Sequence, residues 1–383
     1  MASMSDQGFV VQGWCPGALR PMLSGDGLVV RVRPDAGRLT QAQAAGLADA
    51  SRRHGNGLID LSARGNVQLR GVTEASHPAL IDELRALGLI DDDPVSEARR
   101  NILVTPFADA ATDALAHAVA AALQDAPDLP GKFGFAVDTG PAPVLQAVSA
   151  DIRLERDARG GLMLRCDGLA LGAPLREPDA AAPAIALAQW FVDAGGVTDR
   201  RGRMAALIAR GQRPTGALAA TVSPAPADAV PGPGLVPQGV LVGFEFGQLP
   251  AESLARLAAL GDLRVTPWRM LLIEGLRHLP DLPGMILDAD DPIRRVVACT
   301  GAPGCLQAHR PVRALARRLA PQVPEGRMLH ITGCAKGCAH PAATDVTLVA
   351  TPSGFDLILL GRAQDTPATV GLPEPDIQLK GLF

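Results

Sequence analysis

Four cysteines stand in two close pairs toward the carboxyl end of the chain. Five residues separate Cys299 from Cys305, and three separate Cys334 from Cys338. Each iron of a cubane cluster takes one thiolate from the protein, so two such pairs can hold two edges of a [4Fe-4S] cluster. Paired ligands of structural zinc are usually about two to four residues apart, which fits the first pair poorly. The spacing favours a [4Fe-4S] cluster and leaves a zinc site or unliganded thiols as alternatives.

Glycine accompanies both cysteine pairs. Gly301 and Gly304 lie within the first pair, while Gly333 and Gly337 each precede a cysteine of the second. A residue without a Cβ lets backbone N–H groups approach a cysteine sulfur, and such hydrogen bonds raise the reduction potential of a cluster. We therefore expect backbone donors close to the sulfurs.

Basic residues lie around the second cysteine pair. His330 and His340 flank it, and we expect them to form hydrogen bonds near the cluster rather than to bind the metal. Lys336 lies between the two cysteines. The only other lysines are Lys132 and Lys380, in a chain whose remaining cationic side chains are all arginine. A GC-rich coding bias accounts for this preference for arginine; the alternative is that a lysine retained against the bias has a function.

The composition limits the class of protein. With 383 residues, 47% of them hydrophobic, the chain is long enough for more than one packed unit. Its formal net charge of −4 argues against a nucleic-acid-binding protein. Residues 1–11 have no charged segment followed by an apolar run, and the apolar stretch at 180–192 is too short to span a bilayer. We expect a cytoplasmic protein with no membrane partner, whose cysteines are thiols rather than disulfides.

The chain contains two weakly similar halves. In the first, a strand at 27–31 precedes a helix that begins after Thr40, where Gln43 completes a capping box, and that ends at Gly55. A strand pair at 58–62 and 67–72 and a helix at 79–87 follow. The second half repeats this order with a strand at 239–243, a helix at 252–260 and a strand pair within 263–273.

This repeat predicts an α+β fold with pseudo-twofold symmetry. Each half combines a ferredoxin-like half-domain with a larger α+β unit, and the second larger unit carries the cysteine pairs. The segment 214–237 is rich in Ala and Pro and is expected to be an extended connector. The expected units are residues 1–95, 96–213, 238–290 and 291–383, with the connector between the second and the third.

The cysteine pattern is similar to the cluster motif of the siroheme sulfite and nitrite reductase superfamily. In that superfamily the last cysteine, here Cys338, also faces the tetrapyrrole. Residues 61–68, Leu-Ser-Ala-Arg-Gly-Asn-Val-Gln, resemble a strand whose arginine, here Arg64, addresses the bound anion. Arg100 lies in a segment that resembles the second arginine site, and Lys132 lies in one that resembles a Leu-Pro-Arg-Lys-Phe-Lys sequence. The resemblance implies a nitrite/sulfite reductase-like fold with a [4Fe-4S] cluster in its second larger unit.

Other segments resemble the precorrin-3B synthase family within this superfamily. They are 15–22, 24–28, 54–61, 132–138 and 333–341. Gly134 also stands where the superfamily has a second lysine for reducing sulfite or nitrite, which disfavours that activity. The resemblance implies O2-dependent conversion of precorrin-3A to precorrin-3B in aerobic cobalamin biosynthesis, by hydroxylation at C20 and closure of a γ-lactone from the ring A acetate. It also implies an additional non-haem iron, with the tetrapyrrole as substrate.

The substrate of that reaction is a macrocycle fringed with carboxylates, so its site needs cationic side chains around an apolar cleft. The family motifs select Arg64, Arg100 and Lys132 as catalytic residues. We expect Arg20, Arg31 and Lys336 to bind substrate, with Arg33 and Arg70 as further candidates.

Electrons are expected to come from another protein. A Gly-x-Gly-x-x-Gly turn after a strand would indicate a bound dinucleotide, but the nearest sequence, at 232–234, lacks the third glycine. An external NAD(P)H-dependent reductase or a ferredoxin is the expected partner. No ligands for a second iron and no firm role for Cys15 follow from the sequence. The alternatives are a siroheme-dependent sulfite or nitrite reductase, a tetrapyrrole carrier and a zinc-stabilised binding module.

Overall fold

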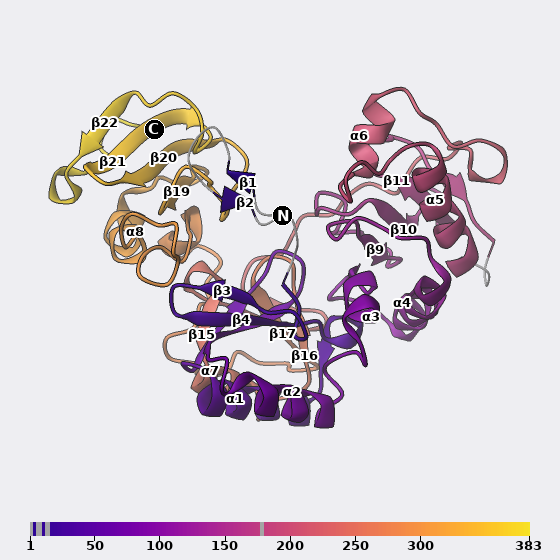
Figure 1. Cartoon of the computed structure of the whole chain (residues 1–383), viewed down its shortest axis with the longest axis horizontal. Helices are drawn as coiled ribbons and strands as arrows, with labels where there is room; N and C mark the ends of the chain where they lie inside the picture. The colour runs from indigo at the N-terminus through magenta and orange to yellow at the C-terminus, as the bar shows by residue number, and fades with distance from the viewer. Residues whose placement is uncertain (1–2, 5–9, 12–15, 177–179) are drawn as a thin grey trace.

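The computed structural model describes residues 3–4, 10–11, 16–176 and 180–383, which form a central body and two lobes (Figure 1). The central body contains two sheets. The first has the order β15 (Gln248–Pro250), β6 (Leu58–Leu61), β7 (Val67–Val72), β4 (Gly27–Val32) and β3 (Met22–Ser24). The second has the order β13 (Gly234–Val236), β14 (Gly239–Gly243), β17 (Met270–Glu274), β16 (Leu263–Val265) and β5 (Arg38–Leu39).

Each half of the chain contributes one strand to the sheet of the other half. β15 pairs antiparallel with β6, and Gln248 lies opposite Asp60. β5 pairs antiparallel with β16, and Leu39 lies opposite Leu263. One hydrophobic core contains buried side chains from both halves, and it is covered by helices α1 (Gln41–His54), α2 (His77–Ala86) and α7 (Ala251–Ala258). The two ferredoxin-like units therefore form one packed body.

Several local elements form where the sequence predicts them. Thr40 is the N-cap of α1; its hydroxyl accepts from the Gln43 N–H, and the Gln43 side chain accepts from the Thr40 N–H. This confirms the capping box, which satisfies two backbone donors that the first helical turn would otherwise leave without partners. The strands expected at 27–31 and 239–243 are β4 and β14. The helices expected at 79–87 and 252–260 begin slightly earlier, as α2 and α7.

The two lobes have the same strand order. The first lobe is a sheet of β8 (Ile102–Val104), β9 (Phe135–Asp138), β10 (Ile152–Arg156), β11 (Leu162–Cys166) and β12 (Ala173–Pro174). The second is a sheet of β18 (Val296–Ala298), β19 (Leu329–Thr332), β20 (Thr344–Thr351), β21 (Gly354–Gly361) and β22 (Thr369–Leu372). In each, the first two neighbouring pairs are parallel and the last two antiparallel. The pseudo-twofold relation thus extends to the lobes.

Helices and short elements complete the lobes. The helices are α3 (Pro94–Arg99), α4 (Ala110–Ala122), α5 (Ala181–Asp193) and α6 (Met204–Ala209) before the second ferredoxin-like unit, and α8 (Arg313–Leu319) in the second lobe. The short strands β1 (Ser3–Met4) and β2 (Val10–Val11) form a separate antiparallel pair. The segment 214–237 contributes β13 to the second sheet of the central body. It also forms two isolated β-bridges with the first lobe, Val222 with Gly172 and Pro224 with Asp157. None of the helices in these described ranges is long and apolar enough to cross a membrane.

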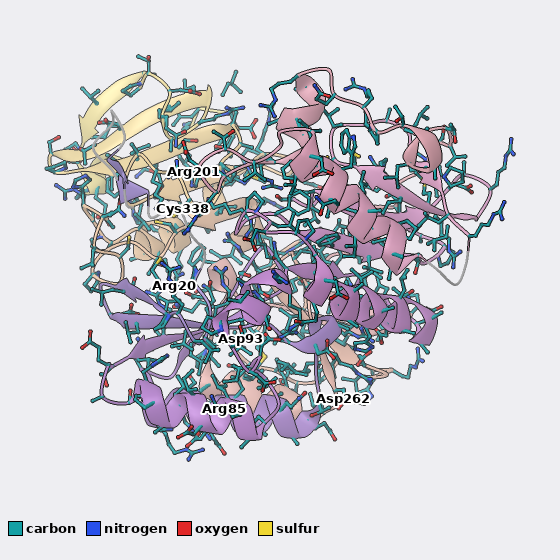
Figure 2. The ribbon with its side chains drawn as sticks, turned by 45° about the vertical axis from the view of Figure 1, so that its right-hand side comes forward. Arg20, Arg85, Asp93, Arg201, Asp262 and Cys338 are labelled. Atoms are coloured by element: carbon teal, nitrogen blue, oxygen red, sulfur yellow. The ribbon has the colours of Figure 1, made fainter. Side chains whose placement is uncertain are left out.

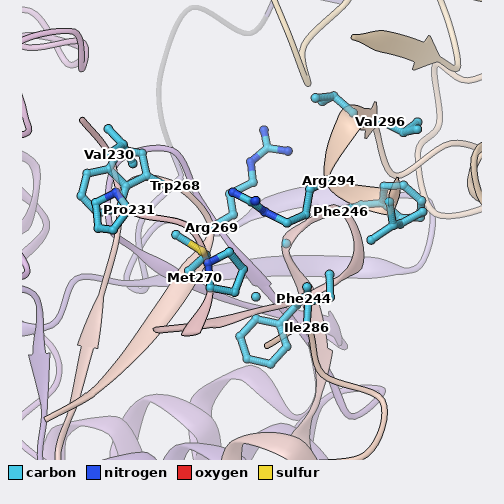
Figure 3. Close-up of a pocket in the computed structure, with 15 residues that line it drawn as sticks. Val230, Pro231, Phe244, Phe246, Trp268, Arg269, Met270, Ile286, Arg294 and Val296 are labelled. Atoms are coloured by element: carbon cyan, nitrogen blue, oxygen red, sulfur yellow. The ribbon is translucent and has the colours of Figure 1, made fainter. Parts of the chain in front are cut away.

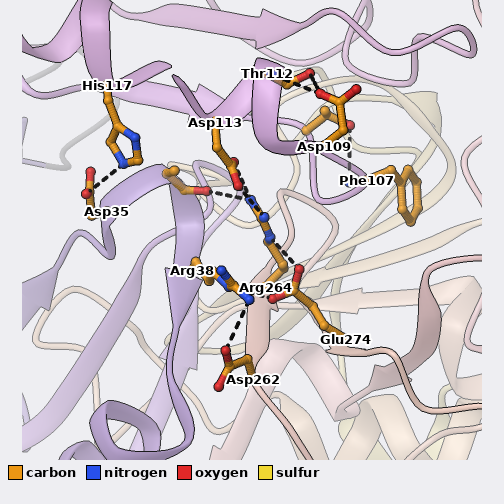
Figure 4. Close-up of polar contacts among 12 residues, drawn as sticks. Asp35, Arg38, Phe107, Asp109, Thr112, Asp113, His117, Asp262, Arg264 and Glu274 are labelled. Carbon is orange, nitrogen blue, oxygen red and sulfur yellow. Dashed lines mark hydrogen bonds and ion pairs between the residues drawn. The ribbon is translucent and has the colours of Figure 1, made fainter. Parts of the chain in front are cut away.

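A network of ion pairs joins the first lobe to the central body (Figure 4). The buried guanidinium of Arg264 on β16 donates to both carboxylate oxygens of Asp113 on α4, each at 2.7 Å. Its Nε donates to Glu274 Oε1 at 3.0 Å. Glu274 also accepts from Arg38 Nε at 2.7 Å. Because these groups come from both ferredoxin-like units and from α4, the network fixes the lobe to both halves.

Candidate metal centre

The two cysteine pairs lie at the carboxyl ends of two neighbouring strands. β18 ends directly before Cys299, and β19 ends just before Cys334. The two strands are adjacent and parallel, so the loops that follow them leave the same edge of the sheet. The backbone N–H of Gly333 donates to Sγ of Cys299 at 3.1 Å, across the two loops. This confirms, for Cys299, the expected backbone donor at a glycine beside the cysteines.

The thiols affect one another's ionisation. Burial raises the pKa of Cys338 to about 11, and the three other cysteines of the two pairs add to that rise. Burial also raises the pKa of Cys334, with Cys305 and Cys299 adding to it. Iron binds the thiolate form, so a cluster would supply the positive charge that holds these sulfurs deprotonated.

The cysteines differ in their exposure. Cys334 is buried, Cys299 and Cys305 are half-buried, and Cys338 is exposed. Figure 2 shows Cys338 on the side of the second lobe that faces the central body. That position suits a ligand that binds a cluster and also faces a large substrate.

The described thiols fit the chemistry of a cluster site. Cys166 and the four paired cysteines are all free, as expected, and Cys15 lies outside the described residues. Within those residues, no group of three or more His, Cys, Asp or Glu side chains is arranged to hold a single metal ion. A cubane instead takes one thiolate on each of its irons, so its ligands stand apart from one another.

One histidine beside the site behaves differently from expectation. His330 lies on β19 with a fully buried side chain, and its ring packs against that of His340 with centroids 5.9 Å apart. Burial lowers the pKa of His330 to about 4, so its ring is neutral at physiological pH. Among the described residues, neither ring nitrogen has a hydrogen-bond partner. The hydrogen bond expected from this side chain is therefore not formed, because its strand places the ring in the interior.

The turn between β3 and β4 holds the first cysteine loop. The carbonyl oxygen of Gly304 accepts from Ser24 Oγ at 2.6 Å, from the Gly25 N–H at 3.2 Å and from Arg70 Nη2 at 2.8 Å. A Cβ at Gly25 would lie 1.9 Å from the carbonyl oxygen of Pro303, so only glycine permits this approach. The segment 24–28, selected above by family resemblance, thus packs on the cysteine loop.

Two of the candidate arginines have partners within the fold. Arg70 is buried and pairs with Asp26 at 2.6 Å. Arg33 is buried beside Glu97, at 3.5 Å, and donates to the Glu97 carbonyl at 2.8 Å. These contacts argue against the expectation that Arg33 and Arg70 bind substrate, because a buried ion pair is costly to break.

The selected basic residues lie at different places in the fold. Arg64 is half-buried in the turn between β6 and β7, and Arg31 on β4 donates to Gln68 Oε1 at 2.7 Å. Arg100 follows α3 and its Nε donates to Asp91 at 3.0 Å. Lys132 is exposed before β9, Arg20 is exposed before β3, and Lys336 is half-buried between the cysteines. Lys336 thus lies at the candidate metal centre, and the roles of all six residues stay predictions.

A pocket of about 210 Å³ lies where the central body meets the second lobe (Figure 3). Trp268, Phe246 and Arg294 are among its lining residues. Arg269 also lines it, and its Nη2 donates to the carbonyl of Ala339, the residue after Cys338, at 3.1 Å. The sequence motifs do not point to Arg269, although a cationic side chain in the strand pair at 263–273 is a usable signal.

Comparison with known proteins identifies the family. Residues 20–87 match the nitrite/sulfite reductase ferredoxin-like half domain. A precorrin-3B synthase from Sinorhizobium sp. is 31% identical, over 93% of this chain and 84% of its own length. Ferredoxin–nitrite reductases from Synechococcus elongatus and Leptolyngbya laminosa are 26% and 25% identical, over 90% and 91% of this chain and 81% and 83% of theirs.

The fold comparison agrees. The solved structure of Mycobacterium tuberculosis NirA covers 87% of this chain, and the match covers 75% of that chain, with a TM-score of 0.63 and 20% identity. The nitrite/sulfite reductase-like α+β fold predicted from the sequence is confirmed. The protein is an oxidoreductase. Because its identity to the Sinorhizobium enzyme extends over most of both chains, the chain belongs to the precorrin-3B synthase family of the nitrite/sulfite reductase superfamily.

Proposed function

We propose that this protein is a precorrin-3B synthase of aerobic cobalamin biosynthesis. It would use O2 to hydroxylate precorrin-3A at C20, and the ring A acetate would then close the γ-lactone. The observation that carries the proposal is a set of four thiols on adjacent strand ends, with Cys338 exposed, in a chain of this family. A [4Fe-4S] cluster bound there would supply single electrons, which closed-shell side chains cannot provide.

The chain's own residues would bind and orient the macrocycle. Arg64, Arg31 and Lys132 are accessible to solvent in whole or part, so their charges can meet substrate carboxylates. Each charge-assisted hydrogen bond of this kind contributes about 1.5–3 kcal/mol. Arg20 and Lys336 would add further contacts, and Arg100 would do so while held by Asp91. An additional non-haem iron belongs to the proposal without assigned ligands.

The electron donor in this proposal is a separate protein. Two relatives are named ferredoxin–nitrite reductases, which supports a ferredoxin as one donor class. An NAD(P)H-dependent reductase is the other. The proposed location of the reaction is the cytoplasm.

The second candidate function is siroheme-dependent reduction of sulfite or nitrite, which the two nitrite reductase relatives favour. One contact argues against it. A Cβ at Gly134 would lie 2.6 Å from Asn101 Nδ2 and 3.1 Å from the Asn101 carbonyl, so a lysine there would force Asn101 to move. Asn101 is itself held by a hydrogen bond to the Phe133 carbonyl, at 2.7 Å. A lysine at position 134 would therefore have to displace the Asn101 side chain from this hydrogen bond.

Turnover with precorrin-3A tests the proposal directly. The protein with its iron-sulfur cluster bound is incubated with precorrin-3A, a reductant and isotopically labelled O2, and the product is analysed by mass spectrometry. One labelled oxygen in the product supports the synthase. Unchanged but bound precorrin-3A indicates a carrier, whereas siroheme bands with reduction of sulfite or nitrite indicate the second candidate; either result overturns the proposal.

A further inference from the structure

We infer that Asp60, Gln248, Arg70, Arg269 and Arg313 form a clamp that positions both cysteine loops and raises the reduction potential of the cluster. The inference rests on the cluster of the proposed function and adds residues that act on it without binding it. These five residues are called the Asp60 clamp below. They are positioning residues, since their contacts are with the cysteine loops rather than with a reacting group.

Each arginine of the clamp donates to a backbone carbonyl in the cysteine loops. Arg70 Nη2 donates to Gly304 at 2.8 Å, and Arg313 Nε donates to the carbonyl of Cys299 at 3.2 Å. Arg269 Nη2 donates to Ala339, in the other loop, at 3.1 Å. The three arginines come from β7, α8 and the turn between β16 and β17, so both ferredoxin-like units and the second lobe contribute.

Asp60 is the carboxylate that contacts Arg70 directly and Arg313 through Gln248. Its Oδ2 lies 3.5 Å from Arg70 Nη1, and its Oδ1 accepts from Gln248 Nε2 at 2.8 Å. Gln248 Oε1 in turn accepts from Arg313 Nη1. Burial lowers the pKa of Arg269 and that of Arg313, and the charge of Asp60 opposes this lowering in both. Asp60 is only 9% exposed, so these partners compensate its charge in place of water.

The clamp leaves positive charge beside the cysteines. The clamp contains three guanidinium groups and the carboxylate of Asp60, and Asp26 adds a second carboxylate through its pair with Arg70. The difference, three minus two, is one positive charge. The Cys338 thiol interacts electrostatically with Arg269, and the Cys299 thiol with Arg313. Reduction adds one negative charge to a cluster, so nearby positive charge in a weakly screened site favours the reduced form.

The chain offers a matched control on the same helix. Arg317 lies one turn after Arg313 on α8, and both guanidinium groups stand 5.7 Å from the centroid of the Phe246 ring. Arg317 donates to Glu245 at 2.6 Å, and its side chain is 53% exposed. Removing its charge therefore changes the same helix without touching a cysteine loop.

The test measures the midpoint potential by redox titration with paramagnetic resonance, together with iron content and the lifetime of the cluster under a chelator. Arg269→Met and Arg313→Met are expected to lower the potential and to shorten the lifetime several-fold. Asp60→Asn is expected to raise the potential while also shortening the lifetime. Arg269→Lys keeps the charge and is expected to hold the potential nearer the parent value. Arg317→Met is expected to resemble the parent.

Opposite signs for Asp60→Asn and Arg269→Met support the electrostatic role, which a purely structural effect would not produce. The inference is wrong if Asp60→Asn and Arg269→Met shift the midpoint potential in the same direction. It is also wrong if the potentials and cluster lifetimes of these variants equal those of Arg317→Met. A Met variant that folds but binds no iron supports positioning, and Asp60→Asn and Arg269→Lys then decide the electrostatic part. A parent protein that binds no iron overturns the proposed function itself, which keeps the two failures distinct.

Discussion

The backbone N–H of Gly333 lies 3.1 Å from Sγ of Cys299 and donates to it. This contact joins the two cysteine loops through the residue that precedes Cys334. Parallel pairing of β18 and β19 makes the approach possible, since it puts both loops at one sheet edge. A Cβ at Gly333 would lie 2.6 Å from the Cβ of Ala308, so glycine is needed where the loops meet. The two cysteine loops thus meet at one edge of the sheet.

Removing a paired cysteine should remove the cluster. Cys299→Ala and Cys338→Ala each delete a ligand, and we expect both to lose most of their iron and visible absorption. Cys166→Ala is the control, because Cys166 is buried in the core of the first lobe. Iron content and absorption spectra of the three variants are the measurement. Full iron in Cys338→Ala would show that this sulfur is not a ligand.

Gly25→Ala should disturb the site from outside the cysteine loops. The added Cβ would lie 1.9 Å from the Pro303 carbonyl oxygen, so the first cysteine loop must move. We expect lower iron content and faster bleaching in air with the secondary structure retained. Gly140→Ala is the control, since a Cβ there meets no heavy atom within 4 Å. Equal iron in the two variants would contradict the role of this turn.

Arg64→Ala and Lys132→Ala should weaken precorrin-3A binding without loss of iron. Each removes one charge-assisted contact, worth about 1.5–3 kcal/mol, or roughly a ten- to hundredfold change in affinity. Arg85→Ala is the control, because Arg85 pairs with Asp82 on the exposed face of α2, far from Cys338 in Figure 2. Substrate titration and turnover are measured. If both variants bind and turn over precorrin-3A like the control, these residues do not contact the substrate.

Asp113→Ala should loosen the first lobe. It leaves the guanidinium of Arg264, 3% exposed, without its bidentate partner. Breaking a buried pair in this way costs about 3–5 kcal/mol. Asp82→Ala, on an exposed pair, should change stability by less than about 1 kcal/mol. Denaturant midpoints compare the two, and similar midpoints would mean that the network does not anchor the lobe.

The stability of α4 should depend on acid pH through Asp109. This N-cap carboxylate accepts from the Thr112 backbone and side chain, which lowers its pKa below the ordinary value of 3.8. Its contribution is therefore present above the ordinary pKa and is lost as pH falls through the lowered one. Asp109→Ala should cost about 1 kcal/mol near neutral pH and progressively less in acid. Denaturant titrations at several pH values check this, and a cost that stays constant into acid would contradict it.

Structural features that depend only on residues close together in the sequence were predictable. Thr40 and Gln43 satisfy each other's backbone donors locally, so the start of α1 needs no tertiary information. The cysteine loops were also predictable as a unit, because spacing and glycine content belong to each loop.

Contacts between distant segments were not predictable. β5 and β15 are too short to carry a strand pattern, so their exchange between the halves depends on how the whole body packs. Asp60, Gln248 and Arg313 lie in three separate segments that meet only in the folded chain. The pairing of Arg70 on β7 with Asp26 was not predictable for the same reason, because Asp26 lies in the turn between β3 and β4, distant in the sequence.

The most direct measurement is the iron, zinc and acid-labile sulfide content of the anaerobically purified protein, with its paramagnetic resonance spectrum after reduction. We predict about four sulfides and at least four irons per chain and the signal of a reduced [4Fe-4S] cluster, with the sulfide and the signal absent from Cys299→Ala. One zinc per chain, with neither iron nor sulfide, would contradict it.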